Sequence, residues 1–322
     1  MLTRSKVNYS GIAMKDLVTL QCDVKRKSRS NNTSCQQKQK TDKFNGIILF
    51  DIESLKVNVG QTSSGENIAK WIPHQIAWAV YDSKLESICE KNYYVAEMWV
   101  NSNYRRQISA QFKDSFKLHH QKVLSNNYPV KSASKIINKM LKCIQKYNVN
   151  IIASYNIHSD FVSLKNLVND VISDKTNINN SQFNCKYSNP FRMNIDYCDL
   201  MHNVGVFYID YLIDEGLKDE KIFRDAGSRH RIKLTGRDAS KGVYSAEYVL
   251  SKFFDLKQSH FAEEDVDFEM KLFRKMVDDF GLKDLELNVM YPDNLYNKFR
   301  DKILKEHSEK VKSAYMYAKT TN

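Results

Sequence analysis

The sequence predicts an α/β protein in which helices flank a mixed five-stranded sheet. The first observation is a set of short apolar runs, bounded by polar residues, that have the length and composition of strands. They lie at residues 46–52, 73–81, 93–96, 149–153 and 194–198. The second observation is a set of longer segments with apolar residues at helical spacing. Strands and helices in this order are typical of a mixed sheet covered by helices.

The first three predicted strands follow one another closely. The run from Gly46 to Phe50 is apolar throughout, which indicates a buried strand. A polar segment containing Gly60 and Gly65 leads to the second strand at 73–81. Because the return to the third strand at 93–96 is also short, we expect the three to form an antiparallel meander.

Helical periodicity begins after the third strand. The stripe Ile136, Ile137, Met140, Leu141 and Ile144 predicts a helix that precedes the strand at 149–153. Another helix is expected to begin near Asp160, and two more are expected at 246–254 and around 270–280. From about residue 286 the chain is charged and aromatic, and we expect one long helix near 293–318.

The N-terminal residues differ in composition from the rest of the chain. Residues 1–43 contain ten Lys or Arg and three Asp or Glu, so most of the net charge of +11 lies there. Residues 24–43 have almost no apolar side chains and cannot offset the entropy of ordering. We therefore expect a disordered basic tail at 1–43, a folded domain at 44–285 and a helical C-terminal extension at 286–322.

The charge and the apolar pattern restrict the class of partner. A strongly positive chain indicates an anionic partner, with nucleic acid as the first candidate, although a tail that is merely solvated has the same composition. No apolar run approaches the 18 residues of a membrane-spanning helix, so no membrane partner is expected. The sequence does not predict an oligomeric state.

The six cysteines are scattered through the chain without the paired spacing of a disulfide framework. This pattern is typical of a reducing compartment, and we expect a cytoplasmic protein. The Lys-, Asn- and Ile-rich composition is typical of an AT-rich genome, such as that of a virus or phage acting in a host cell.

Two carboxylates follow the first apolar run. Asp51 and Glu53 are two residues apart on the predicted strand, so they project from the same face while Ile52 turns into the core. Adjacent carboxylates repel each other unless a cation lies between them, and Mg²⁺ prefers such oxygen ligands. On its own this pattern is weak evidence for a metal site, because acidic residues are common at strand ends.

Two further segments carry carboxylates at the start of a helix. Asp160 follows Asn156 by four residues, and its simplest interpretation is a first-turn carboxylate that stabilises the helix dipole. His260 precedes Asp265 by five residues in a segment between two predicted helices. A histidine in a loop is usually just solvated, but here it also has the spacing to lie over Asp265.

Together these segments predict a metal site. Four carboxylates that converge on one edge of a sheet would repel strongly unless divalent ions offset their charge. Two such ions about 4 Å apart catalyse in-line displacement at phosphorus. His260, whose unperturbed pKa is near neutrality, is suited to accept the proton of the attacking water.

The motifs occur in an order that resembles a known family. The pattern Asp-x-Glu at 51–53, Asn-x-x-x-Asp at 156–160 and His-x-Ala-x-x-Asp at 260–265 is similar to that of the DnaQ-like, DEDD-type 3′–5′ exonucleases, in the subgroup with a histidine. The resemblance covers about residues 44–282 and implies a ribonuclease H-like fold. It also implies two Mg²⁺ ions, with Mn²⁺ as an alternative.

The resemblance assigns roles to individual residues. It makes Asp51, Glu53, Asp160 and Asp265 catalytic metal ligands and His260 the general base. It places Asn156 as the residue that organises the second motif, and Ser54 and Leu55 beside the terminal nucleotide. Departures from the family pattern, such as Ser159 in place of the usual aromatic residue, concern how the terminal base packs.

The predicted function is a metal-dependent 3′–5′ exonuclease that hydrolyses single-stranded DNA or RNA to nucleoside monophosphates. The alternative is an inactive nucleic-acid-binding protein that uses the exonuclease fold as a scaffold. The basic segment at 215–242 either lines the path of the nucleic acid or is a solvated loop.

Overall fold

The computed structural model describes residues 44–111, 113–125, 129–172, 178, 182, 183, 185, 190, 191, 195–218, 245–257, 261–289, 305 and 309. Four sequence predictions concern the remaining residues: the tail at 1–43, most of the 215–242 segment, the general base His260 and most of the 293–318 helix. They lie outside the described residues. The chain divides into one compact unit of Met1–Leu200 and Ser259–Met290 and a second of Met201–Gln258 and Tyr291–Asn322.

The first unit contains a mixed sheet whose strand order is β4-β3-β2-β1-β5-β6. The strands are β1 (Gly46–Gln61), β2 (Asn67–Asp82), β3 (Ser87–Val95), β4 (Val130–Lys131), β5 (Ile151–Ser154) and β6 (Asp196–Asp199). The first three are antiparallel neighbours, as predicted, whereas β5 and β6 run parallel to β1. The prediction of five strands was wrong by one, because β4 has only two residues and too short a pattern to recognise.

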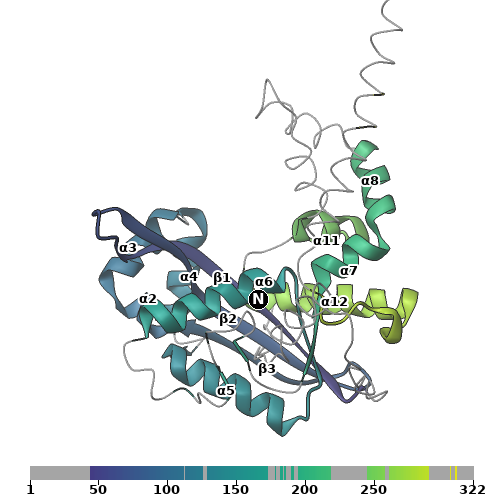
Figure 1. Ribbon diagram of the computed structural model, residues 1–322, viewed down its shortest axis with the longest axis horizontal. Helices are drawn as coiled ribbons and strands as arrows, with labels where there is room; N and C mark the ends of the chain where they lie inside the picture. Colours follow the sequence, from purple (N-terminus) through teal and green to yellow (C-terminus); the bar gives the residue numbers. More distant parts are fainter. Residues whose placement is uncertain are drawn as a thin grey trace, which may run out of the picture. The chain divides into compact units, whose positions relative to one another are not determined.

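The helices of the first unit are α2 (Ala96–Val100), α3 (Ser102–Gln111), α4 (Lys113–Leu124), α5 (Ala133–Lys146), α6 (Ile157–Asn166) and α12 (Ala262–Phe280) (Figure 1). A π-helical turn, η1 (Leu167–Val171), continues α6, and a 3₁₀ turn, η2 (Leu282–Asp284), follows α12. The sequence predicted α5, α6 and α12. It did not predict α2–α4, because α3 has a largely polar sequence without a clear apolar stripe.

The two faces of the sheet are covered by different helices. On one face, Phe50 of β1 stacks on Phe161 of α6 with ring centroids 6.2 Å apart, and Lys139 of α5 lies over the ring of Tyr93. On the other face, Gln75 of β2 donates a hydrogen bond to Glu263 of α12. Since side chains alternate along a strand, Asp51 and Glu53 project toward the α12 face.

The core of the first unit is formed mainly by the two longest strands. Residues 47–50 of β1 have no exposed surface, and residues 76–80 of β2 are equally buried. A continuous apolar run of this kind is expected where both faces of a strand are covered. The carboxylates that follow Phe50 are therefore attached to a rigid part of the sheet.

The second unit includes α7 (Leu200–Phe207), α8 (Ile209–Lys218) and α11 (Ala246–Phe254). The bounds of α11 are those that the apolar spacing predicted. The ring of Phe253 lies 4.7 Å from that of Tyr208 and 5.5 Å from that of Tyr211, which joins α11 to α8. In the described parts of both units, no helix has the length and apolar character needed to cross a membrane.

Candidate metal centre

Three of the predicted carboxylates lie together in the first unit. One oxygen each from Asp51 and Glu53 of β1 and Asp265 of α12 form a group in which all three atoms lie within 4.8 Å of one another. Ile52, between the first two, is 8% exposed and points into the core. Alternation along β1 therefore produces the pair, and α12 brings the third carboxylate to it.

Asp265 lies in the first turn of α12. The helix begins at Ala262, and its first turn carries Glu263, Glu264 and Asp265. Negative side chains in the first turn interact favourably with the positive end of the helix dipole. The backbone N–H of Asp265 donates to the carbonyl of Phe261 at 3.0 Å, so this turn is well formed.

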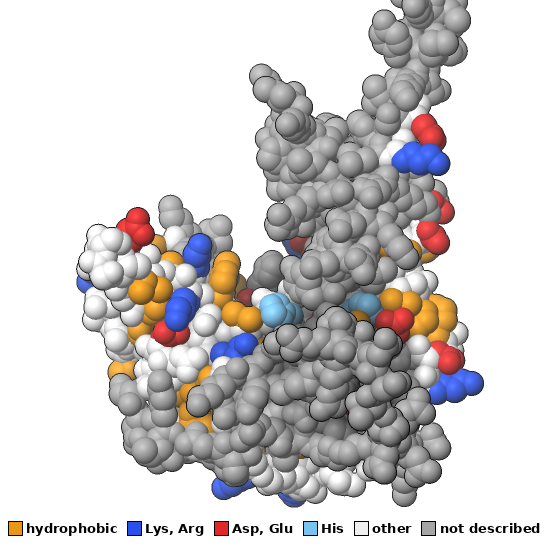
Figure 2. All heavy atoms as spheres, viewed as in Figure 1, with side chains coloured by type: hydrophobic (Ala, Val, Ile, Leu, Met, Phe, Trp, Pro, Cys, Tyr) orange, Lys and Arg blue, Asp and Glu red, His pale blue; other side chains and the backbone are white. Residues whose placement is uncertain are grey.

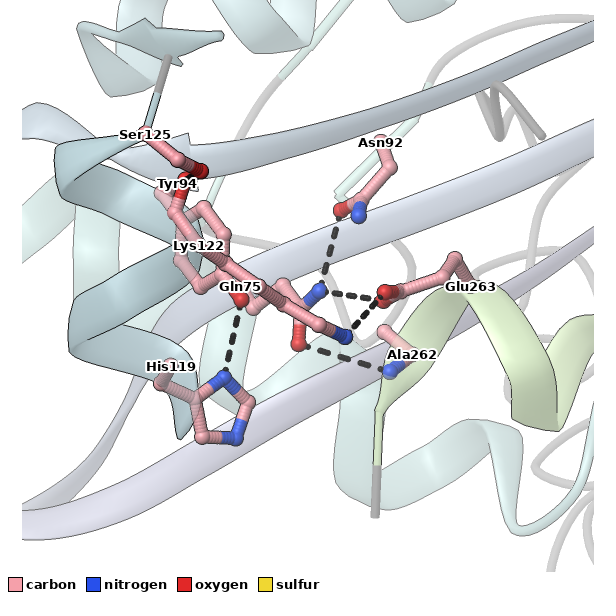
Figure 3. Close-up of polar contacts among 8 residues, drawn as sticks. All are labelled: Gln75, Asn92, Tyr94, His119, Lys122, Ser125, Ala262 and Glu263. Carbon is pink, nitrogen blue, oxygen red and sulfur yellow. Dashed lines mark hydrogen bonds and ion pairs between the residues drawn. The ribbon is translucent and has the colours of Figure 1, made fainter. Parts of the chain in front are cut away.

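A polar network holds the start of α12 against the sheet (Figure 3). The side-chain amide of Gln75 donates to Glu263 at 2.5 Å and to Asn92 at 3.1 Å, and its carbonyl oxygen accepts from the backbone N–H of Ala262. Lys122 of α4 forms an ion pair of 2.6 Å with Glu263. These contacts fix the position of the turn from which Asp265 projects.

Burial and mutual repulsion both disfavour the ionised forms of these carboxylates. Burial, the nearby Glu53, Glu269 and Asp265, and finally Asp160 raise the pKa of Asp51 well above its usual value. Burial and the charges of Asp265 and Asp160 likewise raise the pKa of Glu53 to about 8. Two ionised carboxylates at this separation repel each other by roughly 3–4 kcal/mol at an effective dielectric constant of about 20.

The carboxylates have the chemistry of a divalent-cation site. Oδ2 of Asp51 is buried and accepts no hydrogen bond from the described residues. A hard divalent ion between the three side chains would provide that oxygen with a partner and offset the repulsion. The residues present therefore fit a metal such as Mg²⁺.

Asp160 lies beside this group, although its carboxylate is not among the three described side chains whose oxygens lie within 4.8 Å of one another. Its charge raises the pKa of both Asp51 and Glu53. The hydroxyl of Ser154, at the end of β5, donates a hydrogen bond to Oδ2 of Asp160. This contact lowers the pKa of Asp160, but burial has the larger effect and raises it.

The turn before Asp160 has an unusual backbone conformation. Asn156 adopts a φ of 65° at the start of α6, a left-handed conformation that Asn tolerates better than most residues. Its carbonyl accepts from the backbone N–H of Ser159 at 2.9 Å. Asn156 thus shapes the entry into the helix that carries Asp160.

Sequence analysis missed two buried acidic residues near the group, Glu269 and Asp199. Glu269 lies one turn after Asp265 on α12, and its charge raises the pKa of Asp51. Asp199 ends β6, and its charge raises the pKa of Asp160. The four-residue spacing of Asp265 and Glu269 was a usable signal, because it places both on one face of a helix.

The remaining predicted residues have different positions. Ser54 is partly exposed, directly after Glu53, where the pairing with β2 shifts register. Leu55 has no exposed surface. The nucleotide contacts of both residues remain predictions, as does the role of His260, which lies outside the described residues.

No protein-family model matches the chain, and no curated protein matches it. Two solved structures of E. coli Exonuclease I have a partly similar backbone. The complex with a dT13 oligonucleotide gives a TM-score of 0.38 at 12% identity, covering 72% of this chain and 41% of that one. The complex with a dA16 oligonucleotide gives a TM-score of 0.37 at 9% identity, and the match covers 79% of this chain and 42% of that one. The chain thus matches about two fifths of Exonuclease I, and similarities this low carry no functional argument.

Proposed function

We propose that this protein is a metal-dependent 3′–5′ exonuclease that hydrolyses single-stranded DNA or RNA to nucleoside monophosphates. The observation that carries the proposal is the group formed by Asp51, Glu53 and Asp265, whose oxygens lie within 4.8 Å of one another. These carboxylates come from segments more than 200 residues apart in the sequence. Their order with Asp160 and His260 matches the motif pattern of the DEDD exonucleases.

The proposed roles follow from the positions of the side chains. Asp51, Glu53 and Asp265 would hold divalent cations, with Asp160 as the fourth carboxylate. When bound, two such ions supply a water of lowered pKa and stabilise the charge on the leaving 3′ oxygen. Asp51 and Glu53 keep their geometry because β1 is buried in the sheet. The network of Gln75 and Glu263 holds Asp265 opposite them.

His260 is proposed as the residue that takes the proton from the attacking water. It precedes Phe261, and Phe261 is 8% exposed beneath the amine of Lys122, 3.1 Å from the ring centroid. The unperturbed pKa of histidine lies in the range that suits a general base near neutral pH.

The proposed substrate is a single strand whose 3′ end enters the site. The face of the molecule in Figure 2 carries described Lys or Arg side chains interspersed with Asp or Glu. Positive charge is richest instead in residues 1–43 of the sequence, which hold ten Lys or Arg. We propose that this segment attracts the phosphate backbone, which predicts a steep fall of affinity with salt.

The experiment that tests the proposal is digestion of matched single-stranded DNA, single-stranded RNA and duplex, each labelled at the 5′ end. With Mg²⁺ or Mn²⁺ we expect the single strands, and not the duplex, to give a ladder that shortens from the 3′ end and to release mononucleotides. EDTA should abolish it. A ladder that appears only with a 3′ label, or products longer than mononucleotides, would contradict the direction or the reaction.

Two variants assign the activity to the site. Asp51→Asn keeps the size of the side chain but removes a charged ligand, and we expect it to abolish trimming. Asp278→Asn makes the same change at an exposed position of α12 and should trim at the parent rate. If the parent binds single strands but neither shortens them nor differs from Asp51→Asn, the protein is the inactive binding scaffold.

A further inference from the structure

Two cysteines lie together at a position remote from the carboxylates. Cys89 is on β3 and Cys143 is on α5, and both are partly exposed thiols. On β3, Cys89, Lys91 and Tyr93 share the face that α5 covers, and Lys139 of α5 lies over the ring of Tyr93. The same packing brings Cys143, one turn after Lys139, to Cys89.

The side chains of the two cysteines are in direct contact, because the Cys143 thiol donates a hydrogen bond to the sulfur of Cys89. The hydroxyl of Tyr147 forms a second hydrogen bond to that sulfur, and it accepts one from the amine of Lys146 at 3.0 Å. Lys91 adds a second positive charge nearby. All the neighbours of Cys89 named here therefore stabilise its thiolate.

This environment changes the acidity of Cys89. The hydrogen bond from Cys143, followed by Lys91, Tyr147 and Lys146, lowers the pKa of Cys89 to about 6, although burial acts in the opposite direction. A thiolate is the nucleophilic form of cysteine, and one next to a second thiol is poised to form a disulfide. By contrast, burial and the charge of Asp199 raise the pKa of Cys198.

We propose that Cys89 and Cys143 form a reactive dithiol that low-molecular-weight disulfides such as glutathione disulfide oxidise to an intrachain disulfide. The Cys89 thiolate attacks one sulfur of the oxidant, breaks its S–S bond and releases one thiolate. Cys143 then gives its proton to solvent and attacks the Cys89 sulfur, and a second thiolate leaves. The two protein thiols are oxidised, and the oxidant is reduced to two thiols. The proposal does not depend on the nuclease function.

The structure favours this pair over the other described cysteines. Cys198 is fully buried in β6, where an oxidant has no access. Cys185 is partly exposed, and its thiol donates a hydrogen bond of 4.0 Å to the backbone carbonyl of Lys165 rather than to a second cysteine. Cys185 therefore provides a matched control with similar exposure.

The test treats the reduced full-length chain with glutathione disulfide, blocks the remaining thiols with iodoacetamide and digests the protein with trypsin. We expect mass spectrometry to show residues 85–91 joined to residues 143–146 as the main cross-link, which dithiothreitol removes. Cys89→Ser and Cys143→Ser should abolish it, whereas Cys185→Ser should leave it unchanged. A main cross-link that involves any other cysteine would overturn the proposal.

A second measurement does not require the disulfide to form. Iodoacetamide at pH 6.5 should alkylate Cys89 at least roughly 10-fold faster than Cys185, because Cys89 is largely thiolate at that pH whereas an ordinary cysteine thiol is mostly protonated. Cys143→Ala should remove most of this advantage, since it removes the hydrogen-bond donor. Equal rates at Cys89 and Cys185 in the parent protein would also overturn the proposal. Circular dichroism checks that each variant is folded.

Discussion

Glu269 accepts a hydrogen bond of 2.9 Å from the backbone N–H of Tyr155, and this contact joins α12 to the turn that leads into α6. Asp265 lies one turn earlier on the same helix, and Asp160 lies in the first turn of α6. A single hydrogen bond thus links the segments that carry two of the proposed metal ligands. The other carboxylate oxygen of Glu269 is buried and has no hydrogen-bond partner among the described residues.

The first prediction concerns this contact. Glu269→Ala removes the acceptor of the Tyr155 N–H and should raise the Mg²⁺ concentration needed for half-maximal trimming by roughly 10- to 100-fold, as expected for a residue that orients metal ligands. Glu269→Gln keeps an acceptor for the same N–H and should recover most of the loss. A titration of activity with Mg²⁺ measures both.

The control for this prediction is again Asp278→Asn, on the exposed side of α12. If Glu269→Gln is as impaired as Glu269→Ala, then the charge of Glu269 matters more than its hydrogen bond. In that case Glu269 would be a metal ligand itself.

The second prediction concerns pH and metal together. The pKa of Glu53 is raised from 4.5 to about 8 in the folded protein without metal. The folded state therefore binds more protons than the unfolded state between these values, and stability should fall as pH rises from about 4.5 to 8. Mg²⁺ should restore the stability lost at high pH, because the ion binds the ionised carboxylates.

Thermal unfolding at pH 5.5 and pH 9, with EDTA or with Mg²⁺, measures this effect. Mg²⁺ at about 100 times its dissociation constant adds about 2.7 kcal/mol, which corresponds to a rise in Tm of roughly 5–10 °C at pH 9. The rise should be much smaller at pH 5.5 and absent in Asp51→Asn. An equal rise at both pH values would exclude the carboxylates as the metal-binding groups.

The third prediction concerns the ion pair of Lys122 and Glu263. The Glu263 side chain is 3% exposed and that of Lys122 is 13% exposed, so the pair is largely removed from water. Lys122→Met should destabilise the protein by about 3–5 kcal/mol, because it leaves a buried carboxylate without its cation. Urea denaturation measures the loss.

The double variant Lys122→Met/Glu263→Gln provides the control. It removes both charges and should recover part of the lost stability, since the new side-chain amide oxygen would still accept from Gln75. Lys275→Met, which removes the amine of an exposed ion pair on α12, should change stability by less than about 1 kcal/mol. A double variant that is less stable than Lys122→Met would show that Glu263 has a further role.

The pairing of Asp51 with Glu53 was predictable because it depends only on alternation along a strand, which is a local property. Asp265 was predictable as a helix-start carboxylate, but its distance from β1 was not, because it depends on how α12 packs on the sheet. The Gln75–Glu263 contact that sets this packing joins residues 188 positions apart. No periodicity in the sequence encodes such a contact.

The missed features have a common physical reason. Helices α2–α4 have no clear apolar stripe, so their position depends on contacts of single side chains such as the indole N–H of Trp99, which donates to the carbonyl of His74. Strand β4 exists because Val130 and Lys131 pair with the end of β3. In both cases the tertiary contact decides the local structure, and the local sequence alone is ambiguous.

The last prediction concerns Ser154, whose hydroxyl donates to Asp160. This hydrogen bond favours the ionised carboxylate and lowers its pKa. Ser154→Ala should therefore raise the pKa of Asp160 and move the acidic limb of the pH–rate profile for trimming upward by roughly one to two pH units, since a bond to a charged group is worth about 1.5–3 kcal/mol. At a pH high enough to ionise Asp160 in both proteins, the rates should approach each other.

Ser154→Thr separates this electrostatic effect from a packing effect, because it retains the hydroxyl at the end of β5 and should keep the parent profile. A rate that falls equally at all pH values in Ser154→Ala would indicate a structural role for the serine instead. The pH dependence is informative because a defect in packing has no reason to disappear at high pH. A defect of Ser154→Ala that is confined to low pH would therefore indicate a change in the ionisation of the carboxylate that Ser154 contacts, Asp160.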